Sequence, residues 1–430
     1  MKVLQNPGME LFGVMKRGDK AFYHNTGMQY LLLLAQYVFP LLTLPYLTRV
    51  LEAELYGVIT YLTAIITYFQ ILIDFGYNLS ATKTIAEHQT DKPYIGRILG
   101  QVIQGRVILL LLSFIIYVIL VHSIPLTKEY LLLSYLYFGI VVFSALMSDF
   151  LFRGLERTGI LTIRYVVSQL ITTALIFLLV QTQNDVIWIP VLRILGLLLA
   201  VIITWYHVSR KLQIRVYYSS IRDVLKSMKE SAIYFVSAFA TTAFGVTNTF
   251  LFGVMNLPAS QIAYWGVSYT LIGAIQSLYS PIVSSLYPHV AARRDFQLLK
   301  KILISLVPIN GICVLLLFLI SESVILIFSG SDYMDAVPIF NWLLPVLVFS
   351  FPAMLIGFPY LGIADKIANL TATTLISAVF HIMALIFLII IDEFNVVKVA
   401  ILRSLTEFVL LASRVYMAMR LRNRMHKAGR

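Results

Sequence analysis

The chain has 430 residues, of which 59% are hydrophobic and only 13% are charged. A soluble protein carries about a quarter charged residues, because most of its surface must face water. The composition therefore excludes an ordinary soluble protein and predicts an all-α integral membrane protein. The single cysteine, Cys313, excludes an intrachain disulfide and a multi-cysteine zinc site, and we expect no metal site and no cofactor.

Twelve stretches of about 20 mostly apolar residues are long enough to cross a membrane as helices. They cover residues 26–48, 55–78, 98–121, 129–152, 159–181, 186–208, 230–254, 261–286, 302–328, 338–361, 368–391 and 396–419. The first stretch is too long for the apolar part of a secretory signal and lacks a small-residue cleavage site, so we expect it to remain as a spanning helix. The second and eighth are rich in Tyr, Thr and Ser, which suits helices that line a cavity.

Basic residues alternate sharply between successive loops. If residues 1–25 are cytoplasmic, the inside segments hold most of the 33 Lys and Arg residues, and the outside segments hold only Arg49, Lys128 and Lys398. The positive-inside rule then predicts that both termini lie in the cytoplasm. The net charge of +12 is thus an orientation signal and an attraction to anionic lipids, and we expect no nucleic-acid partner.

Two local patterns recur at nearly the same spacing along the chain. Gly154 and Gly362 each follow a similar helix end, and Gly57 and Gly266 each open a helix after an aromatic residue. The repeat unit would hold six helices, so its two copies would share one orientation around an axis along the membrane normal. We therefore expect two six-helix lobes related by a pseudo-two-fold axis, with a central cavity and alternating access. The expected parts are an N-terminal segment (1–25), an N-lobe (26–208), a basic cytoplasmic linker (209–229), a C-lobe (230–420) and a cytoplasmic tail (421–430).

Six short motifs are spread along these helices. They are PLLTLPYLTRVL at 40–51, YG at 56–57, DFGYNLSAT at 74–82, FRGLER at 152–157, SLYP at 285–288 and GSDY at 330–333. Together with the helix number, they resemble the Wzx-type O-antigen and capsule flippases, which belong to the multidrug/oligosaccharidyl-lipid/polysaccharide exporter superfamily. Glu52 and Arg153 depart from the family's usual Gly and Gln, so no family role is carried over to these two positions.

The resemblance implies a function in polysaccharide biosynthesis at the bacterial inner membrane. The substrate would be an undecaprenyl-diphosphate-linked oligosaccharide repeat unit, moved from the inner to the outer leaflet for O-antigen, capsule or exopolysaccharide assembly. Such a protein is a transporter and not an enzyme. A polysaccharide polymerase and a chain-length regulator are the implied protein partners, and proton or sodium coupling is the implied driving force.

Three arginines fall inside predicted spans, namely Arg106, Arg193 and Arg403. Charges within a membrane are costly and usually face the protein interior, and the arginine fork suits phosphate oxygens. We expect these three side chains to be cavity cations that meet the diphosphate or acidic sugars. For Arg403 a structural ion pair is an equal alternative, because Glu407 lies four residues on, on the same helix face.

Other polar or kinking residues, Glu407 among them, suit gating or ion coupling. Asp74 and Asp149 lie near cytoplasmic helix ends, and Arg153 follows Asp149 by one turn, at pairing distance. Asp74 is also a candidate proton or sodium site. Pro40 and Pro45 would kink the first helix, and bending there would act as a gate.

Aromatic rings on the helices that line the expected cavity are candidates for stacking on sugars. These are Tyr30, Tyr37, Tyr61, Tyr68, Tyr264 and Tyr269. We expect His381, in the eleventh span, to be a packed polar residue rather than a proton relay.

Two other functions fit parts of this pattern. A multidrug-type antiporter of the same superfamily would need acidic cavity residues for cationic drugs, whereas the deep charges here include three arginines. A membrane polysaccharide polymerase or acyltransferase would gather catalytic residues at one membrane face, usually on a long outer loop, and no such cluster or loop is evident.

Overall fold

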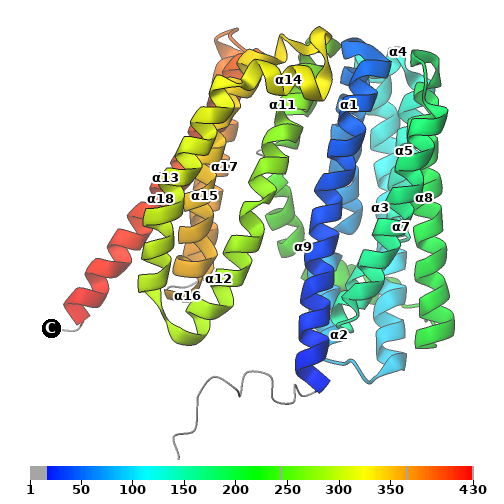
Figure 1. Ribbon diagram of the computed structural model, residues 1–430. Coiled ribbons are helices and arrows are strands. Elements are labelled where there is room, and N and C mark those ends of the chain that lie inside the picture. The colour runs from blue at the N-terminus through cyan, green and yellow to red at the C-terminus, as the bar shows by residue number, and fades with distance from the viewer. Residues whose placement is uncertain (1–16, 243–244, 365–366, 429–430) are drawn as a thin grey trace, which may run out of the picture.

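The computed structural model describes residues 17–242, 245–364 and 367–428, and within these ranges every regular element is a helix. A first group of helices stands on one side of Figure 1. It comprises α1 (Arg17–Asp74), α2 (Tyr77–Ala86), α3 (Lys92–Ser123), α4 (Pro125–Glu129), α5 (Leu131–Ala145), α6 (Asp149–Gly154), α7 (Thr158–Leu179) and α8 (Trp188–Tyr206).

A second group stands beside the first, and α9 (Ile221–Thr242) contacts helices of both. The second group comprises α10 (Val246–Val254), α11 (Ala259–Ser277), α12 (Tyr279–Arg293), α13 (Phe296–Leu319), α14 (Ser321–Ser329), α15 (Ala336–Ile356), α16 (Gly362–Ala364), α17 (Ile367–Ile390) and α18 (Val396–Ala428). The start of α1 and the end of α18 lie at one end of the molecule, called the lower end here, and α4 and α14 lie at the upper end (Figure 1).

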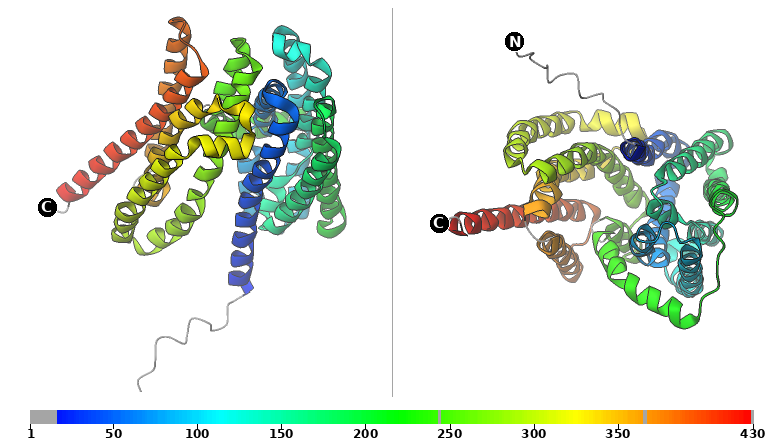
Figure 2. Two further views of the ribbon diagram at one scale, coloured as in Figure 1. Left: turned by 45° about the horizontal axis from the view of Figure 1, so that its top comes forward. Right: turned by 90° about the horizontal axis from the view of Figure 1, so that it is seen from below.

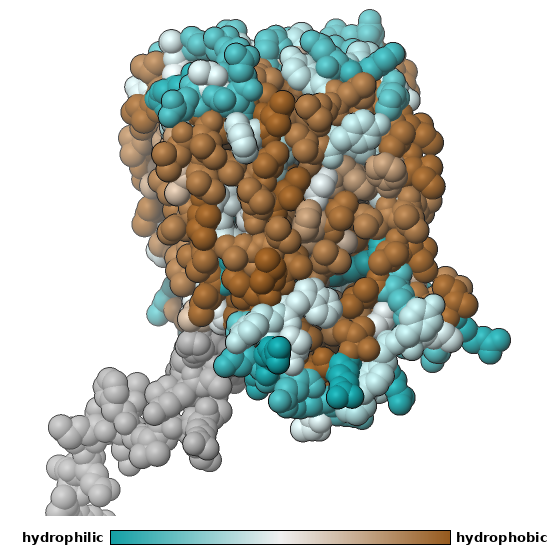
Figure 3. Space-filling view, turned by 90° about the vertical axis from the view of Figure 1, so that its right-hand side faces the viewer, coloured by the Kyte–Doolittle hydropathy of each residue, from teal (hydrophilic) through white to brown (hydrophobic). Residues whose placement is uncertain are grey.

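An apolar belt surrounds the helices between two polar ends. Figure 3 shows this belt on the face formed largely by the first group. It is built from exposed aliphatic side chains such as Leu111 and Ile119 on α3, Leu178 on α7 and Ile202 on α8. So much apolar surface is unfavourable in contact with water but favourable in contact with lipid. The protein is therefore a multi-pass membrane protein, as the composition predicts.

Eight stretches in the described residues are long and apolar enough to cross a membrane, and the first of them, Thr26–Ala86, covers the first two predicted spans. Three further predicted spans, at 230–254, 261–286 and 396–419, are not among the eight. The first is interrupted between α9 and α10, the second is rich in polar residues, and the third carries Arg403, Glu407 and Arg414. The count of twelve and the two symmetric lobes thus remain predictions.

The long helix α1 changes direction at Glu52, whose φ of 56° and ψ of 174° are not helical. This break falls in the predicted loop between the first two spans. Pro40 and Pro45 lie inside the helical stretch before it. The sharp local change in α1 is therefore at Glu52, and any bending at the two prolines stays a prediction.

The predicted linker at 209–229 is only partly irregular. A π-helical turn covers His207–Leu212, and α9 already begins at Ile221. The residues between them lie against α3, where the Gln104 side chain accepts a hydrogen bond from the Ser219 amide at 2.9 Å and donates one to its carbonyl at 3.1 Å. The linker is thus fixed to the first group by its backbone.

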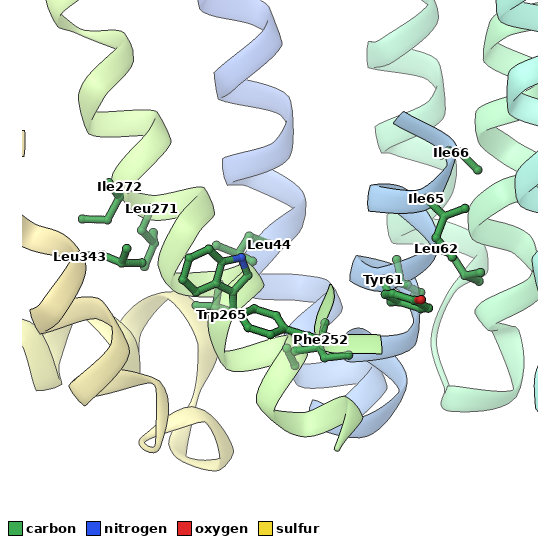
Figure 4. Packing of buried hydrophobic residues seen from close by; sticks show 14 of the residues in the cluster. Leu44, Tyr61, Leu62, Ile65, Ile66, Phe252, Trp265, Leu271, Ile272 and Leu343 are labelled. Atoms are coloured by element: carbon green, nitrogen blue, oxygen red, sulfur yellow. The ribbon is translucent and has the colours of Figure 1, made fainter. Parts of the chain in front are cut away.

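The two groups meet most closely where α1 passes α11. A Cβ atom placed on Gly57 would lie 1.8 Å from the carbonyl oxygen of Ala259, so only glycine allows this approach. Below this crossing, Trp265 packs edge-to-face on Phe252, and Tyr61 packs against Gly253. Figure 4 shows these buried side chains converging from α1, α10 and α11. The core therefore includes the interface between the groups.

Candidate functional site

A polar cavity of about 340 Å³ lies between the two groups, lined by both halves of α1 together with α7, α8, α10 and α11. We call it the polar cavity. Several of the residues that line it carry hydroxyl or amide groups, and aliphatic side chains such as Leu44, Ile59 and Ile176 cover the rest of the wall; the polar ones are Thr43, Thr60, Thr63, Thr67, Gln169, Thr249, Tyr269 and Thr270. Thr60, Thr63 and Thr67 follow helical spacing, so they form one stripe along the second half of α1. Such a wall can hydrogen-bond a sugar on many sides.

Among the described residues that line the polar cavity, Arg193 on α8 is the only charged one. Its position, six residues into α8, is about 8 Å from the start of that helix. No described side chain forms a salt bridge or hydrogen bond with its guanidinium, although Tyr56 and Tyr137 lie within electrostatic reach. A half-buried arginine without a carboxylate partner is available to an anion.

Arg106 on α3 lies elsewhere and has partners that helical spacing did not reveal. It is buried, its Nη2 donates to Asp74 Oδ1 at 2.9 Å, and its Nη1 donates to the carbonyls of Ala145, at 3.2 Å, and of Met147. Its guanidinium also lies over the ring of Phe150, 5.4 Å from the centroid. Arg106 and Asp74 thus form a salt bridge that joins α1, α3 and the turn after α5.

Asp149 pairs with Arg164 on α7 and not with Arg153, so the predicted pairing of Asp149 with Arg153 is wrong. Arg164 Nη2 donates to Asp149 Oδ1 at 2.6 Å, and Nη1 donates to Thr204 Oγ1 at 2.7 Å. Arg153 is exposed. Asp149 and Arg153 both lie on the six-residue helix α6, but the Asp149 carboxylate is bound by the buried Arg164 of the neighbouring α7, while Arg153 remains exposed.

Arg403 and Glu407 on α18 form the salt bridge that their spacing suggested, with Nη1 and Oε2 2.6 Å apart, and both side chains are buried. Near them, His381 on α17 contacts Thr406 Oγ1 through Nδ1 at 2.7 Å and Asn248 Oδ1 through Nε2 at 3.0 Å. These contacts join α10, α17 and α18 in a buried polar network. His381 is thus packed among polar neighbours.

The six candidate tyrosines have different surroundings. Tyr269 lines the polar cavity and stacks on Trp265, with ring centroids 5.6 Å apart. Tyr30 lies near the lower end of α1 and hydrogen-bonds Ser284 on α12 at 2.7 Å. Tyr264 packs against Tyr333, and Tyr61 is fully buried between α1 and α10.

The remaining two tyrosines of the set lie toward the outside of the helix bundle. Tyr37 on α1 is exposed. Tyr68 hydrogen-bonds Thr247 across α1 and α10 and lines an apolar groove on the outer side of these helices. Of the six, only Tyr269 is among the polar-cavity residues described.

A second pocket of about 470 Å³ lies at the lower end, between the start of α1, α12 and the end of α15. Thr26, Gln29 and Tyr30 from α1 face Ser280, Ser284 and Tyr287 from α12 across it. It is therefore a partly polar opening between the two groups, on the lower side of the polar cavity.

The upper end is closed by hydrogen bonds from side chains to backbone carbonyls. Arg49 Nη2 donates to the carbonyl of Ile327 at 2.7 Å, and Thr48 Oγ1 donates to that of Phe328 at 3.5 Å. From the other group, the Tyr333 hydroxyl donates to the Glu52 carbonyl at 3.1 Å. Together with the α1–α11 crossing at Gly57, these contacts join the two groups at the upper end.

A family match covers most of the first two thirds of the chain. The model of the family described as polysaccharide biosynthesis protein matches residues 22–293. The chain belongs to this family. The resemblance predicted from the motifs is thereby confirmed, and the protein is a membrane transporter of the polysaccharide class.

Two relatives carry the name "Putative O-antigen transporter". The one from Escherichia coli (strain K12) is 26% identical over 309 residues, which cover 70% of this chain and 74% of the relative. The one from Shigella dysenteriae is 26% identical over 306 residues, which cover 70% and 76%. The identity extends over most of both proteins, so the relatedness is not confined to one motif.

Two solved structures have a similar fold. The lipid II flippase MurJ, in an inward closed conformation, has a TM-score of 0.68 at 15% identity and matches 92% of this chain and 87% of its own. An inward-facing multidrug resistance MATE transporter of the MOP superfamily has a TM-score of 0.65 at 14% identity, with 92% and 95% covered. At such identities the likeness concerns the fold alone.

Proposed function

We propose that this protein is a flippase that moves undecaprenyl-diphosphate-linked oligosaccharide repeat units from the inner to the outer leaflet of the bacterial inner membrane. The units would serve O-antigen, capsule or exopolysaccharide synthesis. The family and the two O-antigen transporter relatives support the substrate class. The observation that carries the proposal is Arg193, a cation without a carboxylate partner in a hydroxyl-rich cavity between two helix groups.

The cavity chemistry matches the head of such a lipid. The diphosphate would meet the Arg193 guanidinium, whose fork suits phosphate oxygens. Sugar hydroxyls would meet the threonine stripe of α1. A sugar ring would lie against the stacked pair of rings that Tyr269 forms with Trp265. Arg106 and Arg403 would support the cavity through their ion pairs with Asp74 and Glu407, and not through the substrate.

In alternating access, the interface between the two helix groups would open first at its lower end and then at its upper end. The lower pocket at Tyr30 would admit the head, and the hydrogen bonds of Arg49 and Tyr333 would part to release it at the upper end. During this motion the helices would be held together by the carboxylates of Asp74, Asp149 and Glu407. Arg153 would lie at the cytoplasmic surface. Bending of the first half of α1 would occur at Pro40 and Pro45. Proton or sodium coupling would drive the motion.

We also propose twelve membrane crossings in two six-helix lobes, with both termini cytoplasmic. Helix α1 would cross twice because of its break at Glu52, and the pairs α5–α6, α9–α10, α11–α12 and α13–α14 would each cross once. An even number of crossings agrees with the start of α1 and the end of α18 lying at the same end (Figure 1). Anionic lipids, a polysaccharide polymerase and a chain-length regulator would be the partners.

A multidrug-type antiporter is the competing function within this fold. Cationic drugs would need a carboxylate in the cavity, and neither Asp nor Glu is among the described residues that line it. The charge of the polar cavity thus favours an anionic cargo over a cationic one.

The test is complementation of a strain that lacks the gene. We expect lipid-linked repeat units to accumulate in the inner leaflet of the deletion strain, and normal surface polysaccharide in that strain would overturn the proposal. Arg193→Gln should fail to restore export at normal expression, Arg193→Lys should restore it in part, and Leu195→Ala, on the lipid-exposed face of α8, should restore it fully. Full export by Arg193→Gln would remove Arg193 from the mechanism.

A further inference from the structure

An apolar groove of about 530 Å³ lies on the outer side of the group interface. It is lined by the second half of α1, α3, α9, α10 and α17, and we call it the apolar groove. Its wall is almost wholly aliphatic and aromatic, with Ile65, Tyr68, Leu72, Phe250, Ile382 and Ile386 among the residues that line it. Seen from below in Figure 2, α9 lies on the opposite side of the interface from α12, the helix that lines the lower pocket.

The apolar groove and the polar cavity are two sides of one wall. On α1, Thr63 and Thr67 face the polar cavity, whereas Ile65 and Tyr68 face the groove. Helix α10 repeats this division, since Val246 and Thr249 line the cavity and Thr247 and Phe250 line the groove. The wall between a hydroxyl-rich site and an apolar site is therefore a single pair of helices.

Two contacts hold this wall together. The Tyr68 hydroxyl hydrogen-bonds the Thr247 hydroxyl, and two turns earlier on α1 the Tyr61 ring packs against Gly253. The Tyr68 ring also contacts Phe239 and Phe250, with centroids 5.6 and 5.8 Å apart. Tyr68 thus joins the wall and forms part of the floor of the groove at the same time.

We propose that the apolar groove binds the first part of the polyprenyl chain of the lipid-linked substrate while the diphosphate head occupies the polar cavity. The inference rests on the proposed flippase function. An amphiphile needs a polar and an apolar site side by side, and α1 and α10 present both. The run from Ile65 to Leu72 spans about 10 Å along the helix, a third of the apolar thickness of a bilayer, so the rest of a long chain stays in lipid. Aromatic rings on α1, α9 and α10 suit a branched, unsaturated chain.

This arrangement assigns a role to the hydrogen bond between Tyr68 and Thr247. A lipid with its head in the cavity and its tail in the groove must pass between α1 and α10. The hydroxyl pair lies across that passage, so it must open when the substrate loads and can close again once the lipid has left.

Photocrosslinking on α17 tests the proposal with a matched pair of positions. Ile386 lines the groove, and its neighbour Phe387 is also exposed to lipid but does not line it. Each position receives a photoreactive benzoylphenylalanine in the full-length protein, reconstituted in phosphatidylglycerol and phosphatidylethanolamine vesicles with trace radiolabelled undecaprenyl diphosphate. We expect several-fold more label at 386 than at 387, displaced by unlabelled undecaprenyl diphosphate but not by added phosphatidylglycerol.

Two further measurements separate the possible failures. Capture of the radiolabelled lipid by the protein with and without Arg193→Gln reports head binding. Filling the groove with Ile382→Trp should reduce labelling at 386, whereas Met383→Trp, on the adjacent exposed position, should not. If capture depends on Arg193 but 386 and 387 label equally, or phosphatidylglycerol displaces the label, the groove inference is overturned and the flippase function stands. If capture does not depend on Arg193, the head site in the proposed function fails and the groove inference fails with it.

Discussion

Arg106 on α3 and Asp74 at the end of α1 form a salt bridge 2.9 Å long between residues 32 positions apart in the chain. The same guanidinium donates to the carbonyls of Ala145 and Met147, so one side chain joins three separate segments. The Asp74 side chain is 27% exposed and that of Arg106 only 6%, so removal of the aspartate would leave a cation buried without its counter-charge.

We predict that Asp74→Asn lowers the free energy of unfolding by about 3 kcal/mol, because it leaves the buried Arg106 guanidinium without its counter-charge. Arg106→Gln should lower it by less, because the Asp74 side chain that it leaves unpaired is partly exposed. The double variant should lose less than the sum of the two. Thermal unfolding of the purified protein in detergent measures this. Additive losses would mean that the pair does not interact in the folded protein.

The pairing of Asp149 gives a second prediction. Arg164→Gln should lower the melting temperature, because Arg164 is buried and holds both Asp149 and Thr204. Arg153→Gln removes the same charge from an exposed position and should leave the melting temperature nearly unchanged. If Arg153→Gln lowers the melting temperature more than Arg164→Gln does, Asp149 pairs with Arg153, as the sequence suggested.

The α1–α11 crossing gives a third prediction. Gly57→Ala should force the helices apart, because its Cβ atom would overlap the Ala259 carbonyl, and the upper end should open. In a Cys313→Ser background, Ser329→Cys at the buried end of α14 should then react faster with a membrane-impermeant maleimide. Gly273→Ala on α11, where a Cβ atom meets nothing within 4 Å, is the control and should not change the rate. Equal rates in all three proteins would show that the crossing does not close this end.

The orientation in the membrane gives a fourth prediction. In a background without Cys313, Ser123→Cys at the end of α3 should be labelled from outside intact cells by an impermeant thiol reagent, because few basic residues lie at that end. Ser227→Cys on α9 should be protected until the cells are opened. The reverse pattern would invert the proposed topology.

Local sequence relationships were sufficient for some of these features. Hydropathy and loop charge predicted a helical membrane protein, and the four-residue spacing of Arg403 and Glu407 gave their ion pair as an equal alternative to a cavity role for Arg403. The predicted loop near residues 49–54 contains the break of α1 at Glu52. In each case the signal lies within one helix or one turn, where spacing determines which side chains can meet.

Features that depend on contacts between distant segments were not predictable in this way. Arg106 had no partner at helical spacing, because Asp74 comes from another helix. Arg164 is buried and bonds to Asp149 and Thr204, which lie on two other helices, so spacing along the chain gives no sign of either contact. The threonine stripe at 60, 63 and 67 was visible only as a polar helix, since the helices that complete the polar cavity lie far away in the chain. Tyr61 and Tyr68 lie on the cavity-lining half of α1 but face away from the cavity, and only the packing of α10 decides that.

The hydrogen bonds that close the upper end have an evolutionary consequence. Their acceptors are the main-chain carbonyls of Glu52, Ile327 and Phe328, and every amino acid supplies such a carbonyl. Substitutions at Ile327 and Phe328 therefore leave the acceptors in place, whereas the φ of 56° at Glu52 limits the side chains that fit there, although any of them would keep the carbonyl. Selection on this closure falls instead on the donors, chiefly Arg49 and Tyr333, and Glu52 can replace a glycine without loss of the bond that its backbone accepts.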